Sequence, residues 1–273
     1  MKTIKGVFER AKKEGRGVLV GFVTAGDPSP DHTLDIVSAL VSNGVDIIEL
    51  GIPFSDPIAD GPTIQASSLR ALNAGITPPM VLDIAGEVSS SLSVPVVLLT
   101  YYNPIFRMGE EKFLKLASKA GVSGIVVPDL PPEESRGYRR IARKENIDTI
   151  YLATPSTTPK RLDAIVSATR GFLYVVPLYG VTGARESFDS YSKKVVKDIV
   201  GKVRGRVPIA VGFGISKPEH VRSFADQGAD SVIVGSAIVR KIERNLNDRR
   251  SMLRELGELA KDLSSACRNG KSV

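Results

Sequence analysis

The chain has 273 residues, of which 42% are hydrophobic and 25% charged, and its formal net charge is +7. These proportions are ordinary for a soluble globular protein with an apolar core. The basic residues are scattered rather than gathered on one stretch, which argues against a nucleic-acid-binding surface, although the surplus can help attract an anionic substrate. No apolar run approaches the length of a membrane span, so we expect no membrane contact.

Cysteine and histidine are too few for several kinds of site. Cys267 is the only cysteine, so no disulfide can form within the chain, and we expect a reducing, cytoplasmic setting. His32 and His220 are the only histidines, which argues against a histidine-based metal site or a Ser–His–Asp triad. The N-terminal segment is charged and amphipathic and lacks the apolar centre of a secretion signal. We therefore expect no metal in this chain.

Short apolar runs rich in β-branched residues alternate with amphipathic stretches along the chain. A first short helix is expected around Ile4–Ala11, where apolar residues recur at helical spacing. The apolar runs are almost continuously hydrophobic, as parallel strands covered on both faces are. We expect these strands at Gly17–Thr24, Val45–Leu50, Pro95–Tyr101, Gly124–Val127, Thr149–Ala153, Phe172–Val176, Pro208–Gly212 and Ser231–Val234.

The amphipathic stretches between these runs are expected to be helices. Several begin with proline or a capping residue, and several end at a glycine, as at Gly121 and Gly228. A further short helix is expected to open at Ser236. The longer helices are expected at Asp31–Ser42, Thr63–Asn73, Pro79–Ser90, Glu110–Ala120, Pro132–Glu145, Pro159–Ala168, Ser187–Val203, Pro218–Gln227 and Asp248–Ala266.

Repeated alternation of strand and helix predicts parallel strands joined by right-handed crossovers. The pattern fits a (β/α)8 TIM barrel with an extra N-terminal helix and an extended loop after strand 2, within the strandless interval Gly51–Val94. An open doubly wound sheet is the alternative, but the first strand runs into Thr24–Pro28 rather than into a GxGxxG turn. No linker divides the chain, so we expect one domain over residues 1–273.

The segment ELGIPFSDPIADGPTIQ, Glu49–Gln65, places two carboxylates where a barrel carries its chemistry. Glu49 ends an apolar run, where burial is costly and raises a carboxyl pKa into the range for proton transfer near neutrality. Asp60 follows on a loop rich in proline and glycine. We interpret Glu49 as the acid and base and Asp60 as an ionised partner. A structural carboxylate and a turn-forming residue, respectively, are the alternatives.

Glycine-containing turns follow the last three expected strands. They are Gly180–Gly183, Gly212–Gly214 and Gly235–Ser236, the last of which opens a helix. Small residues let backbone N–H groups approach an anion, and a helix N-terminus favours negative charge. Because loops after strands seven and eight commonly bind phosphate in this fold, we predict a phosphate site. The alternative is that these are only tight turns.

Apolar residues near the strand ends can form the wall for a flat aromatic group. The candidates are Phe22, Leu99, Val126 and Ile233, although each alone is more simply explained as core. Tyr101 and Tyr174 are more simply explained by packing, since a tyrosine usually packs. Asp129 also follows a strand, and a turn or helix-entry role before Pro131 is equally plausible for it. No lysine lies within the strands, where a Schiff-base aldolase carries its amine, so C–C cleavage here would use proton transfer.

In combination, the motifs resemble the tryptophan synthase α-subunit family over essentially the whole chain. The segments that carry the resemblance are ELGIPFSDPIADGPTIQ, TYYNPIF, VVPDLPPEES, YGVTG, VGFGIS and VIVGSAIV. The resemblance implies a cytoplasmic (β/α)8 lyase that cleaves indole-3-glycerol phosphate to indole and glyceraldehyde 3-phosphate without a cofactor of its own. It also implies a partner β subunit that carries pyridoxal phosphate, in an α2β2 heterotetramer.

The resemblance further implies roles for individual residues. Glu49 matches the group that protonates the indole ring and then takes the glycerol hydroxyl proton, and Asp60 matches the carboxylate that accepts from the indole N–H. The indole pocket matches Phe22, Leu99, Val126, Tyr174 and Ile233. The phosphate site matches Gly183, Gly212, Gly235 and Ser236, with Thr182 as a loop residue that helps position Asp60. The surface that meets the β subunit matches Pro53–Asp60 and Asn103–Phe106.

Two other functions remain compatible with the residues. Another phosphate-binding barrel, such as a sugar-phosphate isomerase or indole-glycerol-phosphate synthase, shares the glycine turns but not the segment Glu49–Gln65. A non-catalytic barrel that binds and regulates a partner is the third possibility, and the presence of both Glu49 and Asp60 argues against it.

Overall fold

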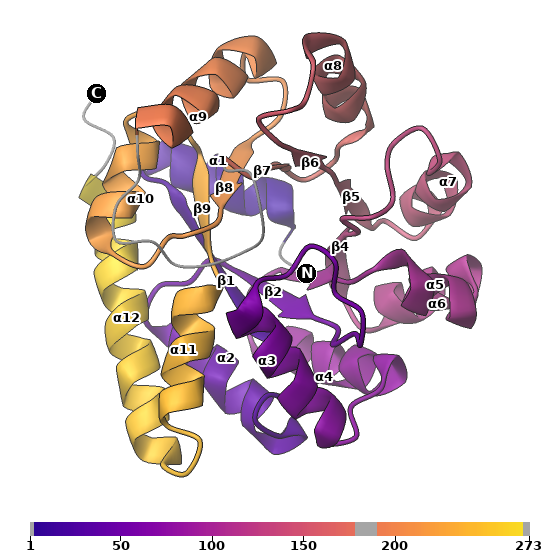
Figure 1. The fold of residues 1–273 in the computed structure, drawn as a ribbon, viewed down its shortest axis with the longest axis vertical. Coiled ribbons are helices and arrows are strands. Elements are labelled where there is room, and N and C mark those ends of the chain that lie inside the picture. The colour runs from indigo at the N-terminus through magenta and orange to yellow at the C-terminus, as the bar shows by residue number, and fades with distance from the viewer. Residues whose placement is uncertain (1–2, 178–189, 270–273) are drawn as a thin grey trace.

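A parallel β-sheet, rolled into a barrel and surrounded by helices, forms the centre of the molecule (Figure 1). The computed structural model describes residues 3–177 and 190–269. Neighbouring strands follow the order β5-β4-β3-β2-β1-β9-β8-β7-β6, and the TIM barrel predicted from the sequence is confirmed. The strands are β1 (Val18–Thr24), β2 (Ile47–Gly51), β3 (Val96–Leu99), β4 (Val122–Val126), β5 (Asp148–Ile150), β6 (Leu152–Ala153), β7 (Leu173–Val175), β8 (Ile209–Gly212) and β9 (Ser231–Val234).

The ninth strand results from a break in the fifth expected one. Tyr151 separates β5, which pairs with β4, from β6, which pairs with β7. The two ends of the sheet are therefore consecutive in the sequence, so the chain itself closes the barrel at this residue. The backbone N–H of Tyr174 donates to the Tyr151 carbonyl over 3.0 Å, which continues the pairing across the break.

The helices lie mostly within a few residues of their predicted positions. Within the part of the chain that the structure describes, none is long and apolar enough to cross a membrane. They are α1 (Ile4–Lys13), the short 3-10 helix η1 (Pro30–His32), α2 (Thr33–Ser42), α3 (Pro62–Asn73), α4 (Pro78–Ser91), α5 (Tyr102–Met108), α6 (Glu110–Lys119), α7 (Arg136–Lys144), α8 (Pro159–Ala168), α9 (Ser190–Val203), α10 (Pro218–Ala225), α11 (Ser236–Arg244) and α12 (Arg249–Asn269).

Two helices differ from the sequence prediction. Helix α7 begins four residues later than expected, because the residues after Pro131 form a separate turn in which the Glu134 N–H donates to the Pro131 carbonyl. Helix α5 is absent from the helices expected from the sequence. Its Pro104 stands in the first turn, where the missing N–H costs nothing. The Tyr102 N–H at its start donates to the Asp129 carboxylate over 2.9 Å, a contact from a distant loop that local sequence does not reveal.

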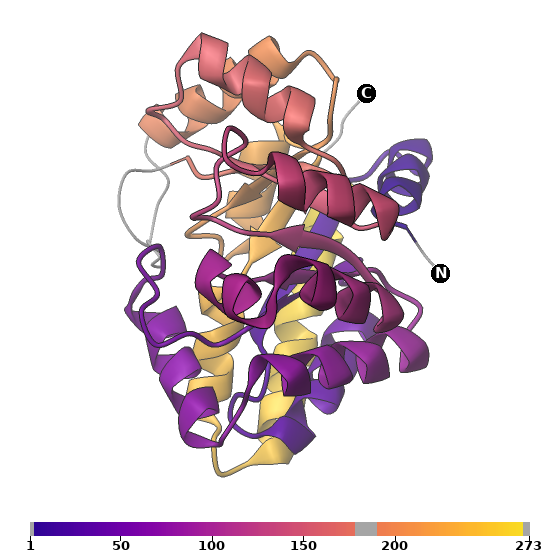
Figure 2. The same cartoon turned by 90° about the vertical axis from the view of Figure 1, so that its right-hand side faces the viewer.

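Helix α1 closes one end of the barrel. Its apolar face, including Ile4, Val7 and Phe8, belongs to the same buried cluster as the side chains that fill the barrel interior. The Phe8 ring lies 6.1 Å from the ring of Phe172, measured between centroids. Figure 2 shows α1 at the end of the barrel opposite the loop between β2 and α3. The carboxyl ends of the strands therefore remain the end at which a ligand can enter.

We expect Phe8→Ala to lower the free energy of unfolding by about 3 kcal/mol, because the truncation leaves a cavity between α1 and the barrel interior. Urea unfolding of the full chain measures this change. Glu9→Ala, an exposed substitution on the same helix, is the control and should change stability by less than about 0.5 kcal/mol. Equal effects of the two substitutions would show that α1 does not close the barrel by apolar packing.

Candidate active site

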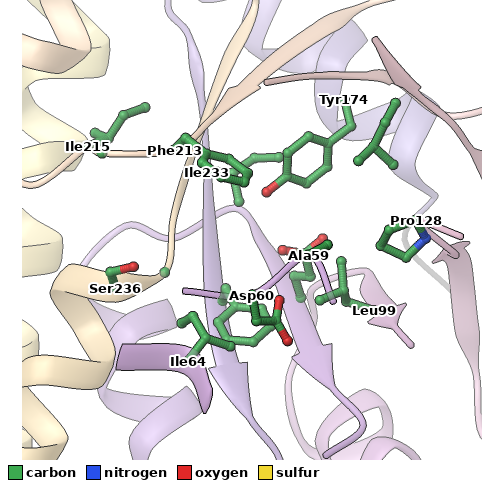
Figure 3. Close-up of a pocket in the computed structure, with 15 residues that line it drawn as sticks. Ala59, Asp60, Ile64, Leu99, Pro128, Tyr174, Phe213, Ile215, Ile233 and Ser236 are labelled. Atoms are coloured by element: carbon green, nitrogen blue, oxygen red, sulfur yellow. The ribbon is translucent and has the colours of Figure 1, made fainter. Parts of the chain in front are cut away.

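A cavity with a largely apolar wall opens at the carboxyl ends of the strands (Figure 3). Glu49 and Asp60 both line it, so the two carboxylates singled out in the sequence lie in one site. The wall is contributed by residues from most of the strands and from the starts of α3 and α11. Its members are Phe22, Glu49, Ala59, Asp60, Ile64, Leu99, Pro128, Leu152, Tyr174, Phe213, Gly214, Ile215, Ile233, Gly235 and Ser236.

Glu49 is fixed by its place in β2. The strand pairs with β1 and β3, and Glu49 lies in register with Phe22 and Val97. Alternation along a strand sends every second side chain inward, so Glu49 faces the barrel interior like the core residue Ile47. Only 1% of its surface is exposed, and its Oε1 atom has no hydrogen-bond partner among the described residues.

Burial sets the protonation state of Glu49. Loss of water around the carboxyl, followed by repulsion from the Asp60 carboxylate, raises the pKa of Glu49 to about 8. The side chain therefore carries its proton at neutral pH. Because the ionised form is unfavourable inside the barrel, the protonated carboxyl is well suited to give up its proton to a bound substrate and to recover it afterwards.

Asp60 lies on the loop between β2 and α3, and its backbone is held on both sides. Its N–H donates to the Pro57 carbonyl over 3.2 Å, and its carbonyl accepts from the Gln65 side-chain amide over 2.8 Å. Burial raises the pKa of Asp60 to about 6, while a hydrogen bond from Tyr101 acts in the opposite direction. At pH 7 Asp60 is thus mostly ionised while Glu49 is mostly protonated.

Two tyrosines complete the polar part of the site. The Tyr101 hydroxyl accepts from the Ala59 N–H over 3.0 Å and also hydrogen-bonds to Asp60. Tyr174 points into the cavity from the side opposite Asp60 (Figure 3). Burial, and then the nearby Glu49 and Asp60 carboxyls, raise the pKa of Tyr174 well above its ordinary value, so its hydroxyl stays protonated.

The end of the cavity at Gly235 and Ser236 is suited to an anion. Gly235 is the N-cap of α11, no side chain among the described residues caps this helix end, and its first turn contains no acidic residue. The free N–H groups and the helix dipole therefore favour negative charge. Phe213 and Gly214, in the loop after β8, both have positive φ angles of 97° and 75°. This backbone conformation turns the loop along the cavity edge.

The structure brings together most of the pocket residues predicted from the sequence, but not all. Phe22, Leu99, Tyr174, Ile233, Gly235 and Ser236 line the cavity with the two carboxylates. Val126 is fully buried in the interior cluster and does not line it. Gly212 does not line it either, and the absence of a side chain there leaves room for the Tyr174 ring. Thr182 and Gly183 lie outside the described residues.

Several lining residues were not recognised in the sequence. Leu152 follows inward-facing Ile150 by two residues, so its strand alternation was a usable signal. Ile64 stands in the first turn of α3, and Pro128 lies on the loop after β4. The positions of these two depend on how distant loops are arranged, which local patterns do not determine.

The site defines a class of protein. Within residues 3–177 and 190–269, no group of three His, Cys, Asp or Glu side chains could bind a metal ion. A parallel barrel that carries a buried proton donor, an ionised carboxylate and an open helix N-terminus at the carboxyl ends of its strands has the organisation of a TIM-barrel enzyme for a phosphorylated substrate.

Comparison with known proteins identifies the family within this class. The family model "Tryptophan synthase alpha chain" matches residues 8–268. The tryptophan synthase alpha chain of Methanopyrus kandleri is 48% identical over 264 residues, which are 97% of this chain and 94% of that protein. The alpha chain of Arabidopsis thaliana is 45% identical over 259 residues, 95% and 93% of the two chains.

Solved structures agree with the sequence relatives. The tryptophan synthase alpha chain of Legionella pneumophila superposes with a TM-score of 0.89 at 33% identity and covers 100% of both chains. A Mycobacterium tuberculosis tryptophan synthase chain gives a TM-score of 0.87 at 34% identity, covering 97% of this chain and 98% of that one. The chain belongs to the tryptophan synthase alpha chain family. The resemblance inferred from the motifs, and the lyase class that it implied, are thereby confirmed.

Replacing Glu49 with glutamine should stabilise the fold in a pH-dependent way. The folded-state pKa of about 8 lies above the ordinary value of 4.5, so the contribution of Glu49 to stability is full below pH 4.5 and is lost as the pH rises through 8. Glu49→Gln has no charge to bury. Its free energy of unfolding relative to that of the parent protein should therefore be about 4 kcal/mol higher at pH 9 than at pH 5.

Urea unfolding at the two pH values measures this difference. The control is Glu258→Gln, which makes the same substitution at an exposed carboxylate on α12. If Glu49→Gln and Glu258→Gln showed the same small change between pH 5 and pH 9, Glu49 could not be held in a desolvated site.

Proposed function

We propose that this chain cleaves indole-3-glycerol phosphate to indole and glyceraldehyde 3-phosphate in the cavity around Glu49 and Asp60. The observation that carries the proposal is the pairing of a protonated, buried Glu49 with an ionised Asp60 in one apolar cavity. Retro-aldol cleavage of an indole needs a proton donor for the ring carbon and a negative charge that stabilises the resulting cation, and this pair supplies both.

The proposed reaction has two proton transfers. Glu49 gives its proton to C3 of the indole ring, and the ring nitrogen takes up the positive charge. The Asp60 carboxylate accepts a hydrogen bond from the ring N–H and so stabilises this cation. Glu49, now ionised, removes the proton of the hydroxyl adjacent to C3, the C–C bond breaks as the aldehyde forms, and the bond electrons return to the ring. The enzyme regains its initial protonation state.

Binding of the two ends of the substrate should fix the position of the reacting carbon. The aromatic ring is proposed to lie against Phe22, Leu99 and Ile233, and the phosphate at Gly235 and Ser236 at the start of α11. Backbone N–H groups at a helix N-terminus bind phosphate without requiring a lysine or arginine in the cavity. Holding both ends sets the distance from the indole C3 to Glu49, which is a large part of the catalytic effect.

The alternatives from the sequence explain the site less well. Another phosphate-binding barrel would use the anion site but gives no reason for two carboxylates with separated pKa values beside an apolar wall. A purely regulatory barrel would gain nothing from burying Glu49, since an unpaired buried carboxyl is destabilising. The alpha-chain reaction accounts for both features.

A partner β subunit is part of the proposal. Ile58, on the loop between β2 and α3, and Phe106, on α5, are large apolar residues with 76% and 69% of their surfaces exposed. They belong to the two segments that the resemblance assigns to the β-subunit interface, and the second of these lies within helix α5. We expect pyridoxal phosphate only in the β subunit, an α2β2 assembly, and a cytoplasmic setting.

Glu49→Gln and Asp60→Asn should each reduce indole release from indole-3-glycerol phosphate by about 10²–10⁴-fold, because each removes one of the two groups that act on the ring. The assay follows indole from the full chain, alone and with the β subunit. Glu111→Gln, an exposed carboxylate on α6, is the control and should leave the rate unchanged. Rates within about threefold of the parent for Glu49→Gln would overturn the assignment.

A further inference from the structure

Tyr101 connects the end of β3 to the loop that carries Asp60. It follows the cavity residue Leu99 by two positions, and only 3% of its surface is exposed. The ring centroid of Phe54 lies 5.4 Å from that of Tyr101, and the Tyr101 hydroxyl accepts from the Ala59 N–H over 3.0 Å. One side chain thus contacts the loop near both ends of residues 54–59.

The same hydroxyl acts on the Asp60 carboxyl. A hydroxyl has one proton to donate and can accept at the same time, so Tyr101 can accept from Ala59 while donating to Asp60. In the described part of the chain, the other titratable groups that act electrostatically with Asp60 are Glu49 from β2 and Tyr174 from β7. Glu49 is protonated at neutral pH and Tyr174 stays protonated, so among the described side chains Tyr101 is the one that favours the ionised form of Asp60.

Tyr101 is itself held from its other side. The next residue, Tyr102, starts helix α5, and its N–H donates to Asp129 over 2.9 Å. The backbone around Tyr101 is therefore fixed between β3 and α5, so its hydroxyl is a fixed reference point for the loop rather than a mobile one.

We propose that Tyr101 is a positioning residue of the active site, which holds the Asp60 carboxylate toward the substrate ring through its bridge from Ala59. This inference rests on the proposed function, since it acts through Asp60. Tyr101 takes no proton and forms no bond in the reaction. Its effect is on the orientation of Asp60 and on the pH at which Asp60 becomes charged.

Tyr101→Phe tests this directly, because it removes only the hydroxyl. We expect kcat for indole release to fall roughly tenfold with KM changed less than about threefold. The acidic limb of the kcat/KM profile should move to higher pH by about one unit, since loss of the hydrogen bond raises the pKa of Asp60. Tyr102→Phe removes the adjacent hydroxyl, which faces Glu110, and should leave the acidic limb in place.

A second measurement does not depend on turnover. Nuclear magnetic resonance of carbon-13-labelled aspartate, with Asp60→Asn to assign the signal, follows the Asp60 carboxyl during a pH titration of the full chain. Its midpoint should rise in Tyr101→Phe and stay in place in Tyr102→Phe. An unchanged midpoint in Tyr101→Phe would overturn the inference and leave Tyr101 as a packing residue. If the parent chain released no indole, the proposed function would fail, while this titration would still decide the role of Tyr101.

Discussion

The exclusion of water from the Glu49 carboxyl is the constraint on which the site depends. A carboxyl inside a barrel of apolar side chains loses its hydration, and its ionised form becomes the unfavourable one. The fold produces this exclusion with ordinary means: strand alternation points Glu49 inward, the barrel interior is packed, and α1 closes the far end. Because burial disfavours the ionised form, the Glu49 carboxyl keeps its proton at neutral pH and is suited to donate it.

The two carboxylates differ because the chain presents them differently. Glu49 is part of a central strand, so its environment is as dry as the barrel itself. Asp60 is on a loop, is less completely buried and has a tyrosine hydroxyl beside it, so burial raises its pKa less. In the proposed reaction, a rigid strand carries the proton donor and a hydrogen-bonded loop carries the charge-stabilising group, which gives the two similar side chains separate roles. The anion site proposed at α11 relies on backbone N–H groups, and the first turn of this helix adds no acidic side chain near them.

Most of the fold could be predicted from the sequence because its signals are local. Continuous apolar runs such as Val45–Leu50 identify buried parallel strands, and proline and glycine indicate where helices begin and end. The errors have non-local causes. Helix α5 was missed because the carboxylate that caps it, Asp129, belongs to another loop. The break between β5 and β6 at Tyr151 reflects barrel closure, which a single run of residues cannot reveal.

The residues of the candidate site also separate into those that local sequence patterns reveal and those that depend on contacts with distant segments. Glu49 and Asp60 were recognisable because a carboxylate after an apolar strand is unusual, and the glycine turns because small residues follow successive strands. No local sequence pattern indicated a role for Tyr101, since a tyrosine at a strand end usually only packs. Its role depends on which atom of a distant loop its hydroxyl meets, here the Ala59 N–H, and only the arrangement in space provides that information.

The most direct test of this account is a titration of the Glu49 carboxyl in the full-length protein. Carbon-13-labelled glutamate, observed by infrared or magnetic resonance spectroscopy and assigned by comparison with a protein lacking Glu49, reports the protonated fraction at each pH. We expect a carboxyl that is still protonated at pH 7 and titrates with a midpoint near 8. A midpoint close to the ordinary value of 4.5 would contradict it, because a carboxyl already ionised at neutral pH would have no proton to give to the substrate.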